Sequence, residues 1–171
     1  MNHHSSHHHA ESSKKEYLKF AAVILSIIGI SVGLFQLLEL EGAMNLMRIF
    51  MGVFFLVFAG FKFAGYKMFA TMFAGYDIIG MRSRMYAWAY PFIELALGIA
   101  YLANFMPVFR DSLTLLIMSI GAIGVWQEIK KRSGVHCACL GNIIKLPLSI
   151  VSLVEDVTMG LMALAMLLWL T

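Results

Sequence analysis

The sequence predicts an all-α integral membrane protein, and composition and block length are the observations behind this prediction. Hydrophobic residues make up 60% of the 171 residues and charged residues 13%, whereas soluble domains contain about 25% charged residues. A soluble globule of this size could not bury so much apolar surface. The apolar residues also occur in blocks of about twenty, the length of a helix that crosses a bilayer core of roughly 30 Å.

Five apolar blocks predict five membrane-spanning helices. They cover residues 18–38, 46–66, 85–103, 113–127 and 148–170. Residues 67–84 contain aromatic residues and glycines but no clean span, which predicts a short amphipathic segment at the membrane interface. Asn104, Pro107 and Asp111 predict a break before the fourth block. We expect the last four spans to form the core of a bundle, with the first span packed outside it.

The chain divides into a short start and two membrane parts. Five histidines occupy the start in interrupted clusters, namely His3, His4, His7, His8 and His9. A purification tag usually has an uninterrupted run, so both a natural disordered tail and a tag remain open for residues 1–13. Residues 14–44 should hold an extra N-terminal transmembrane helix. Residues 45–171 should form a four-helix membrane domain.

The charge of the loops predicts that the N-terminus is cytoplasmic. Ten basic residues then fall on the cytoplasmic side: Lys14, Lys15, Lys19, Lys67, Arg82, Arg84, Lys130, Lys131, Arg132 and Lys145. Only Arg48 and Arg110 fall on the other side, which is the distribution that the positive-inside rule describes. Five spans then place the C-terminus on the opposite side of the membrane from the N-terminus.

Several classes of function find no support in the sequence. The net charge of +3 comes from basic residues spread over several loops rather than one patch, which argues against a nucleic-acid partner. No P-loop, G-x-G-x-x-G or H-E-x-x-H pattern occurs, so neither nucleotide chemistry nor zinc proteolysis is predicted. No Ser-His-Asp arrangement is visible, because His136 is the only histidine after the first ten residues.

The two cysteines of the chain, Cys137 and Cys139, lie two residues apart between a basic helix end and the last span. Thiols at this spacing can form a strained, easily reduced disulfide. They can instead bind Cu(I) with help from His136, or be inert. The basic residues at 130–132 favour the thiolate, and a closed zinc site would need a second pair of ligands that the cysteines do not supply. Redox chemistry, copper binding and an inert pair all remain open.

Ionisable residues interrupt the apolar spans, where each charge is costly and normally pairs or lines a cavity. They are Arg48, Lys62, Glu94, Glu155 and Asp156. The predicted topology places all of these except Arg48 in the inner half of the bilayer, beneath the cysteine segment. We predict an intramembrane polar cluster, or else a structural ion pair of Lys62 with Glu94 or Asp156.

Stripes of like residues occur on three of the predicted helices. Met159, Met162 and Met166 follow Glu155 on one face of the last helix. A row of thioethers can pass Cu(I), although flexible packing between helices is the alternative explanation.

Polar and small residues on the second and third spans should face one another, because small residues permit close helix approach. They are Arg48, Gly52, Phe55, Ala59, Lys62 and Tyr66 on the second, and Tyr90, Pro91, Glu94, Gly98 and Tyr101 on the third.

Several of these segments resemble a known superfamily. The stretch Arg48-Ile-Phe-Met-Gly52 with Phe58-Ala-Gly-Phe-Lys62 resembles the second-helix signature of the DoxX-like membrane proteins, as does Pro91-Phe-Ile-Glu94 with Gly98 on the next helix. The segment Cys137-Ala-Cys-Leu-Gly141, followed by Pro147-Leu-Ser149 and Glu155-Asp156, resembles the MauE branch, a redox-associated membrane protein tied to methylamine utilisation. The likeness covers roughly residues 45–170.

The resemblance implies a DoxX-like four-helix bundle with a role in thiol–disulfide chemistry or in maturation of an exported partner. MauE proteins of methylamine clusters more often have phenylalanine where Leu140 stands, so we carry over the redox-associated role and not the methylamine pathway. The leading hypothesis is a redox accessory protein in which Cys137 and Cys139 work with a thioredoxin-like partner. The alternatives are a Cu(I)-binding or Cu(I)-transfer protein with a copper-handling partner, and a structural subunit of a membrane complex. Beyond Cys-x-Cys, no catalytic motif is recognisable.

The predicted orientation places the thiols at the cytoplasmic face, where disulfides are normally kept reduced. Three explanations remain open: the pair relays electrons, the cysteine segment dips into the bilayer, or the orientation is inverted.

Overall fold

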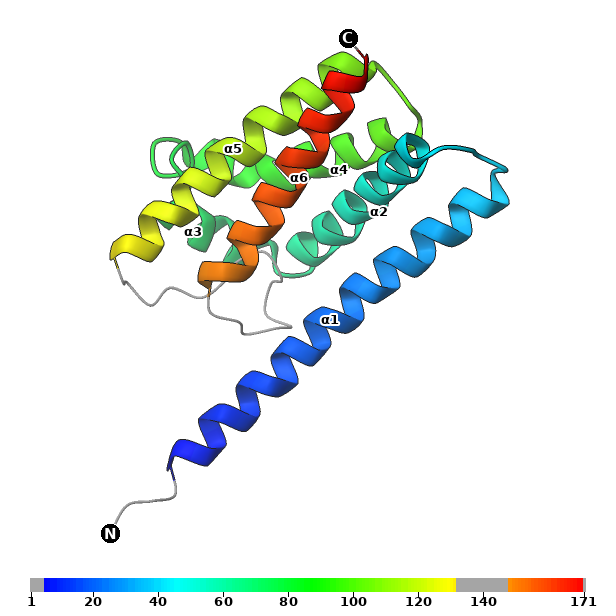
Figure 1. The fold of residues 1–171 in the computed structure, drawn as a ribbon. Coiled ribbons are helices and arrows are strands. Elements are labelled where there is room, and N and C mark those ends of the chain that lie inside the picture. Colours follow the sequence, from blue (N-terminus) through cyan, green and yellow to red (C-terminus); the bar gives the residue numbers. More distant parts are fainter. Residues whose placement is uncertain (1–4, 132–147, 171) are drawn as a thin grey trace.

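The computed structural model describes residues 5–131 and 148–170, and every regular element in these ranges is a helix (Figure 1). The helices are α1 (Ser5–Leu37), α2 (Ala43–Ala64), α3 (Tyr66–Tyr76), α4 (Arg84–Leu102), α5 (Pro107–Lys131) and α6 (Leu148–Leu170). All of them except α3 contain a stretch long and apolar enough to cross a membrane. The prediction of an all-α integral membrane protein with five spans is confirmed.

The spans form two closely packed pairs with α1 to one side (Figure 1). Helix α2 packs against α4, helix α5 packs against α6, and the pairs meet along α4–α5 and α2–α6. Helix α1 contacts α2 and no other element of the described ranges. Within the apolar stretch of α1, Leu18–Leu37, only 11% is buried, as expected for a helix whose side chains face lipid. The two termini lie at opposite ends of the bundle.

Two helix boundaries differ from the prediction. The fourth span was expected over residues 113–127, with Pro107 in the break before it, but α5 begins at Pro107. Proline is favoured at the first position of a helix, because its missing N–H would have no partner there, so this proline starts the helix. Helix α1 begins at Ser5, within residues 1–13 that we expected as a tail or tag.

Residues 67–84, expected as an interfacial segment, form most of α3 and a turn. Helix α3 lies at the end of the bundle where α5 ends and α6 begins (Figure 1). Asp77 ends α3, and its Oδ1 accepts hydrogen bonds from the backbone N–H groups of Ile79 at 3.0 Å and Gly80 at 2.7 Å. Ser83 then caps α4 by accepting a hydrogen bond from the Tyr86 N–H at 3.4 Å. These two caps fix the turn that leads into α4.

Helices α2 and α4 approach each other closely at Gly52 and Gly98. A Cβ on Gly98 would stand 3.1 Å from the Gly52 carbonyl oxygen and 2.9 Å from Leu56 Cδ2. A Cβ on Gly52 would stand 3.2 Å from the Gly98 carbonyl oxygen and 2.7 Å from Leu102 Cδ2. The stripes of small residues therefore face one another, and backbone meets backbone across the pair. This contact sets the separation at which side chains further along α2 and α4 can pair.

Candidate functional site

Lys62 of α2 and Glu94 of α4 form a buried ion pair, in which Lys62 Nζ donates to Glu94 Oε1. Their side chains are 3% and 4% exposed. Glu94 is one of the two partners that the sequence offered for Lys62. A lone charge within a span is costly, and pairing with an opposite charge offsets part of that cost.

Aromatic rings surround the ammonium group of Lys62. Its Nζ lies 4.9 Å from the ring centroid of Tyr90 and 5.5 Å from that of Phe69. The Tyr90 ring in turn lies 4.3 Å from that of Phe73. Ring faces attract a cation and exclude water at the same time. The ion pair is therefore buried against aromatic rings between α2, α3 and α4.

Further charged groups lie around this pair. Tyr86 is within electrostatic range of Lys62 and Glu94, and also of two further carboxyl groups, those of Asp77 and Asp156. A Cβ on Gly121 of α5 would stand 2.9 Å from Asp156 Oδ2, so the Asp156 carboxylate packs against α5 at that glycine. We refer to these residues as the polar cluster, which consists of Lys62, Asp77, Tyr86, Glu94 and Asp156. Helices α2, α4 and α6 and the turn after α3 all contribute to it.

Sequence reasoning missed two members of the polar cluster, Asp77 and Tyr86. Neither interrupts an apolar block in the way that Lys62 or Glu94 does. The signal for Asp77 was local. An aspartate followed three residues later by a glycine, here Gly80, is typical of a turn in which the carboxylate accepts backbone hydrogen bonds. Its place beside the buried pair depends on how α3 packs.

Burial raises the pKa of the Asp77 carboxyl above its ordinary value, although the hydrogen bonds from Gly80 and Ile79 act in the opposite direction. The residue is 1% exposed. Its Oδ2 atom is buried and has no hydrogen-bond partner within the described ranges. The neutral form of this carboxyl is therefore favoured by folding.

Asp77→Asn should remove a pH dependence of stability. Because the folded-state pKa lies above the unfolded-state value of about 3.9, the stabilisation from protonating Asp77 is complete below that value and is lost as the pH rises through the folded-state pKa. The free energy of unfolding of the wild type should therefore decrease, relative to the variant, as the pH rises. Denaturation in detergent between about pH 4 and pH 8 measures the difference. Glu41→Gln, at an exposed acid, is the control, and parallel curves for wild type and Asp77→Asn would contradict the prediction.

Arg48 lies apart from the polar cluster, although the sequence grouped it with the other intramembrane charges. From Arg48 to Lys62, α2 advances 14 residues, about 21 Å at 1.5 Å per residue. Arg48 Nη1 donates to the carbonyl oxygens of Tyr101 at 2.8 Å and Leu102 at 3.0 Å, at the end of α4. A cation is stabilised at a helix C-terminus, so the role of Arg48 is to cap α4.

A second buried ion pair closes the same end as Arg48. Arg110 Nε donates to Asp111 Oδ1 at 2.8 Å, and Arg110 Nη2 donates to Asp111 Oδ2 at 3.2 Å. The guanidinium lies 4.1 Å from the ring centroid of Tyr101, whose hydroxyl donates to Thr114 at 3.2 Å. Asp111, expected in a break, is instead inside α5 and fully buried. These contacts join α4 to α5.

The two acids of α6 face different neighbours, because successive helical residues are about 100° apart. Asp156 packs against α5, whereas Glu155 lines an apolar cavity of about 330 Å³ between α1, α2 and α6, together with Met159. Met162 lines a neighbouring cavity of about 270 Å³ between the same helices. Met159 and Met166 belong to the buried core, and Met162 packs against it. The three methionines of the stripe therefore contribute to packing between the helices.

His136, Cys137 and Cys139 lie outside the described residues. The residues that bracket their segment are described: α5 ends at Lys131 and α6 begins at Leu148. Both helix ends lie at the end of the bundle that holds α3 (Figure 1). Among the residues that the structure describes, no group of three or more His, Cys, Asp or Glu side chains could hold a metal ion.

Comparison with known proteins gives one family. The family model described as methylamine utilisation protein MauE matches residues 40–170. No curated protein and no solved structure gave a significant match. The matched range begins just before α2 and includes every span except that of α1. It covers well over half of the chain, and membership implies a membrane protein in methylamine utilisation. The chain belongs to the MauE family.

Proposed function

We propose that this MauE-family protein is a redox accessory of the bacterial inner membrane, in which Cys137 and Cys139 cycle between a dithiol and a disulfide. The partner is a protein with a thioredoxin-like dithiol or disulfide. The chain would act on that partner during its maturation, with the N-terminus cytoplasmic and the C-terminus periplasmic.

The exchange is balanced without any other reactant. One cysteine thiolate attacks a sulfur of the partner disulfide, which forms a mixed disulfide and releases a partner thiolate. The second cysteine thiolate then attacks the cysteine sulfur of the mixed disulfide, which closes the Cys137–Cys139 bond and releases the other partner thiolate. Two electrons pass to the partner, and the two protons lost by the cysteines balance the two that the partner thiolates gain. The reverse sequence oxidises a partner dithiol.

The observation that carries the proposal is the position of the polar cluster in the bundle. Lys62 lies two residues before the end of α2, and Tyr86 lies two residues after the start of α4. The ends of α5 and α6 that bracket the cysteine segment lie at this same end of the bundle (Figure 1). Ionisable groups within membrane spans commonly mark proton or substrate paths. An acid–base cluster at the end of the bundle where the chain leaves α5 and enters α6 supports thiolate chemistry in the segment between them, because that chemistry depends on proton transfer.

Cys139→Ser and Cys137→Ser, expressed separately in the native host, should trap the partner. Removal of the resolving thiol leaves the mixed disulfide intact, so one of the two variants should give a larger band on a non-reducing gel that dithiothreitol removes. Because the chain has only two cysteines, the double variant is the matched control and should give no such band. The proposal is wrong if neither single variant forms an adduct.

A second candidate function is Cu(I) binding or transfer, and the position of the methionines supports it. Met159 and Met162 line two neighbouring cavities within the spans, on the same face of α6. Thioethers and thiolates are soft ligands that suit Cu(I). In this function the histidines of the start capture the ion, Cys137 and Cys139 bind it with His136, and the methionines pass it on. A copper chelator should then change the accessibility of the thiols, whereas the redox function predicts no such effect.

A further inference from the structure

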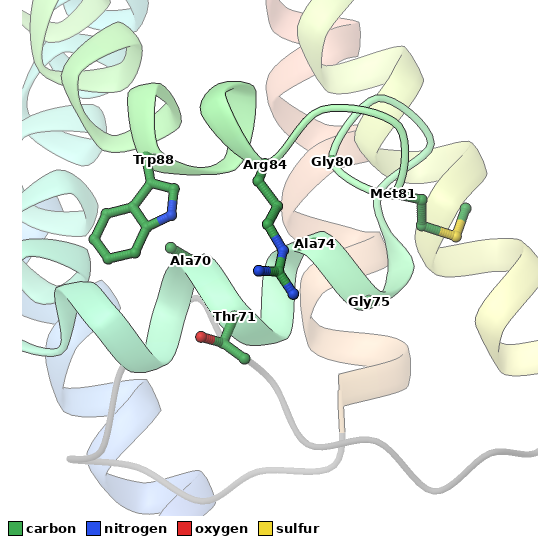
Figure 2. Close-up of a pocket in the computed structure, with 8 residues that line it drawn as sticks. All are labelled: Ala70, Thr71, Ala74, Gly75, Gly80, Met81, Arg84 and Trp88. Carbon is green, nitrogen blue, oxygen red and sulfur yellow. The ribbon is translucent and has the colours of Figure 1, made fainter.

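A polar pocket of about 370 Å³ opens between α3 and the start of α4 (Figure 2). Ala70, Ala74 and Gly75 of α3 and Gly80 of the following turn give it a floor of small residues. Arg84 and Trp88 of α4 line the other side. A Cβ on Gly75 would meet nothing within 4 Å, so the space above this glycine is open.

Arg84 is the charged group of the pocket. Its guanidinium extends from the start of α4 toward α3 (Figure 2). Within the described ranges it has neither a hydrogen bond nor an ion pair, and no acidic side chain lines the pocket. A guanidinium presents a fork of N–H donors that matches the oxygens of a phosphate group. The pocket therefore favours an anion with two adjacent oxygens.

The pocket lies where a membrane span begins. The span Arg84–Leu102 starts at the arginine itself. Tyr66 packs edge-on against Trp88 with ring centroids 4.9 Å apart, and its hydroxyl donates to the Trp88 carbonyl oxygen at 2.7 Å. Tyrosine and tryptophan are typical of the headgroup level of a bilayer. One turn further into the span, Phe92 is 53% exposed and packs edge-on against Phe63.

A polar pocket with a cation, next to an apolar surface that continues into the span, fits an amphipathic anion. We propose that this pocket binds the phosphate of an anionic phospholipid, with Arg84 on the phosphate oxygens and an acyl chain along Trp88 and Phe92. Lys67 and Arg82 are exposed on the same α3–α4 segment and add to the attraction for a negatively charged leaflet. This site is independent of the thiol chemistry proposed above.

Lipid titration of the purified full-length protein tests the proposal. In a neutral detergent, phosphatidylglycerol should bind with one-to-one stoichiometry by native mass spectrometry, and phosphatidylcholine should bind more weakly. Arg84→Gln should weaken phosphatidylglycerol binding about tenfold, because it removes a charge-assisted contact to phosphate. The matched control is Arg82→Gln, at an exposed arginine that does not line the pocket, and it should weaken binding by less than about twofold.

A second pair of variants tests the pocket itself rather than its charge. Gly75→Leu fills the open space and should abolish the one-to-one lipid binding, whereas Gly60→Leu, at a glycine of α2 that also has open space, should not. Equal losses for Arg84→Gln and Arg82→Gln would indicate diffuse attraction and overturn the proposal. So would unchanged binding in Gly75→Leu. Displacement of the lipid by inorganic phosphate alone would identify a free phosphate site, and would also overturn it.

Discussion

Lys62→Met should lower the free energy of unfolding by about 3–5 kcal/mol, the largest loss that we expect from any single substitution. The change removes the ammonium group that pairs with Glu94, whose side chain is 4% exposed. The carboxylate must then either stay charged in an apolar site or take up a proton, and both cost free energy. Equilibrium unfolding in mixed micelles measures the loss.

The double variant Lys62→Met/Glu94→Gln distinguishes the pair from the packing around it. Because both charges are removed together, it should recover most of the stability lost in Lys62→Met. Lys67→Met is the matched control, since Lys67 is an exposed lysine of α3, and it should change stability by less than about 0.5 kcal/mol. A loss in Lys62→Met no greater than that of the control would show that the buried pair contributes nothing.

Gly98→Leu should have the second-largest effect. We expect it to lower the free energy of unfolding by about 3 kcal/mol or more, the upper end of what overpacking typically costs. Even the Cβ would stand 3.1 Å from the Gly52 carbonyl oxygen, and a backbone atom cannot turn aside as a side chain can. Helices α2 and α4 must then separate, which also lengthens the contact between Lys62 and Glu94 further along the pair.

Gly60→Leu is the control for this substitution, because a Cβ on Gly60 meets nothing within 4 Å. Replacing glycine in a helix interior with leucine should by itself stabilise the helix by about 0.5–1 kcal/mol. Thermal unfolding of both variants in the same detergent gives the comparison. If Gly98→Leu were as stable as Gly60→Leu, the close approach of α2 and α4 would not be required for the fold.

The membrane fold could be predicted from the sequence because its signal is local. A block of about twenty apolar residues has few structures available to it in a bilayer, so the number of spans followed from the number and length of the apolar blocks. The start of the fourth span could not be predicted from the same signal. Pro107 breaks a helix interior but favours a helix start, and Asp111 pairs with Arg110 inside α5.

The candidate site was predictable only where a charge interrupts an apolar block. Lys62 and Glu94 stood out for that reason, and the glycine stripes indicated that their helices would face one another. Asp77, Tyr86 and the pocket at Arg84 depend on how α3 folds back against α4, which no periodicity encodes. Arg48 and Lys62 share one stripe of α2 but are 14 residues apart, because charges on one stripe can be separated by several turns.

Differential thiol trapping in native membranes tests the redox role of this MauE-family protein most directly. Reduced thiols of Cys137 and Cys139 would be blocked with one reagent, and thiols released by dithiothreitol would be labelled with a second reagent of higher mass. The account predicts that part of the population carries the second label on both cysteines, and that this part is independent of a copper chelator. Two thiols that are fully reduced, slow to alkylate and unaffected by the chelator would contradict it.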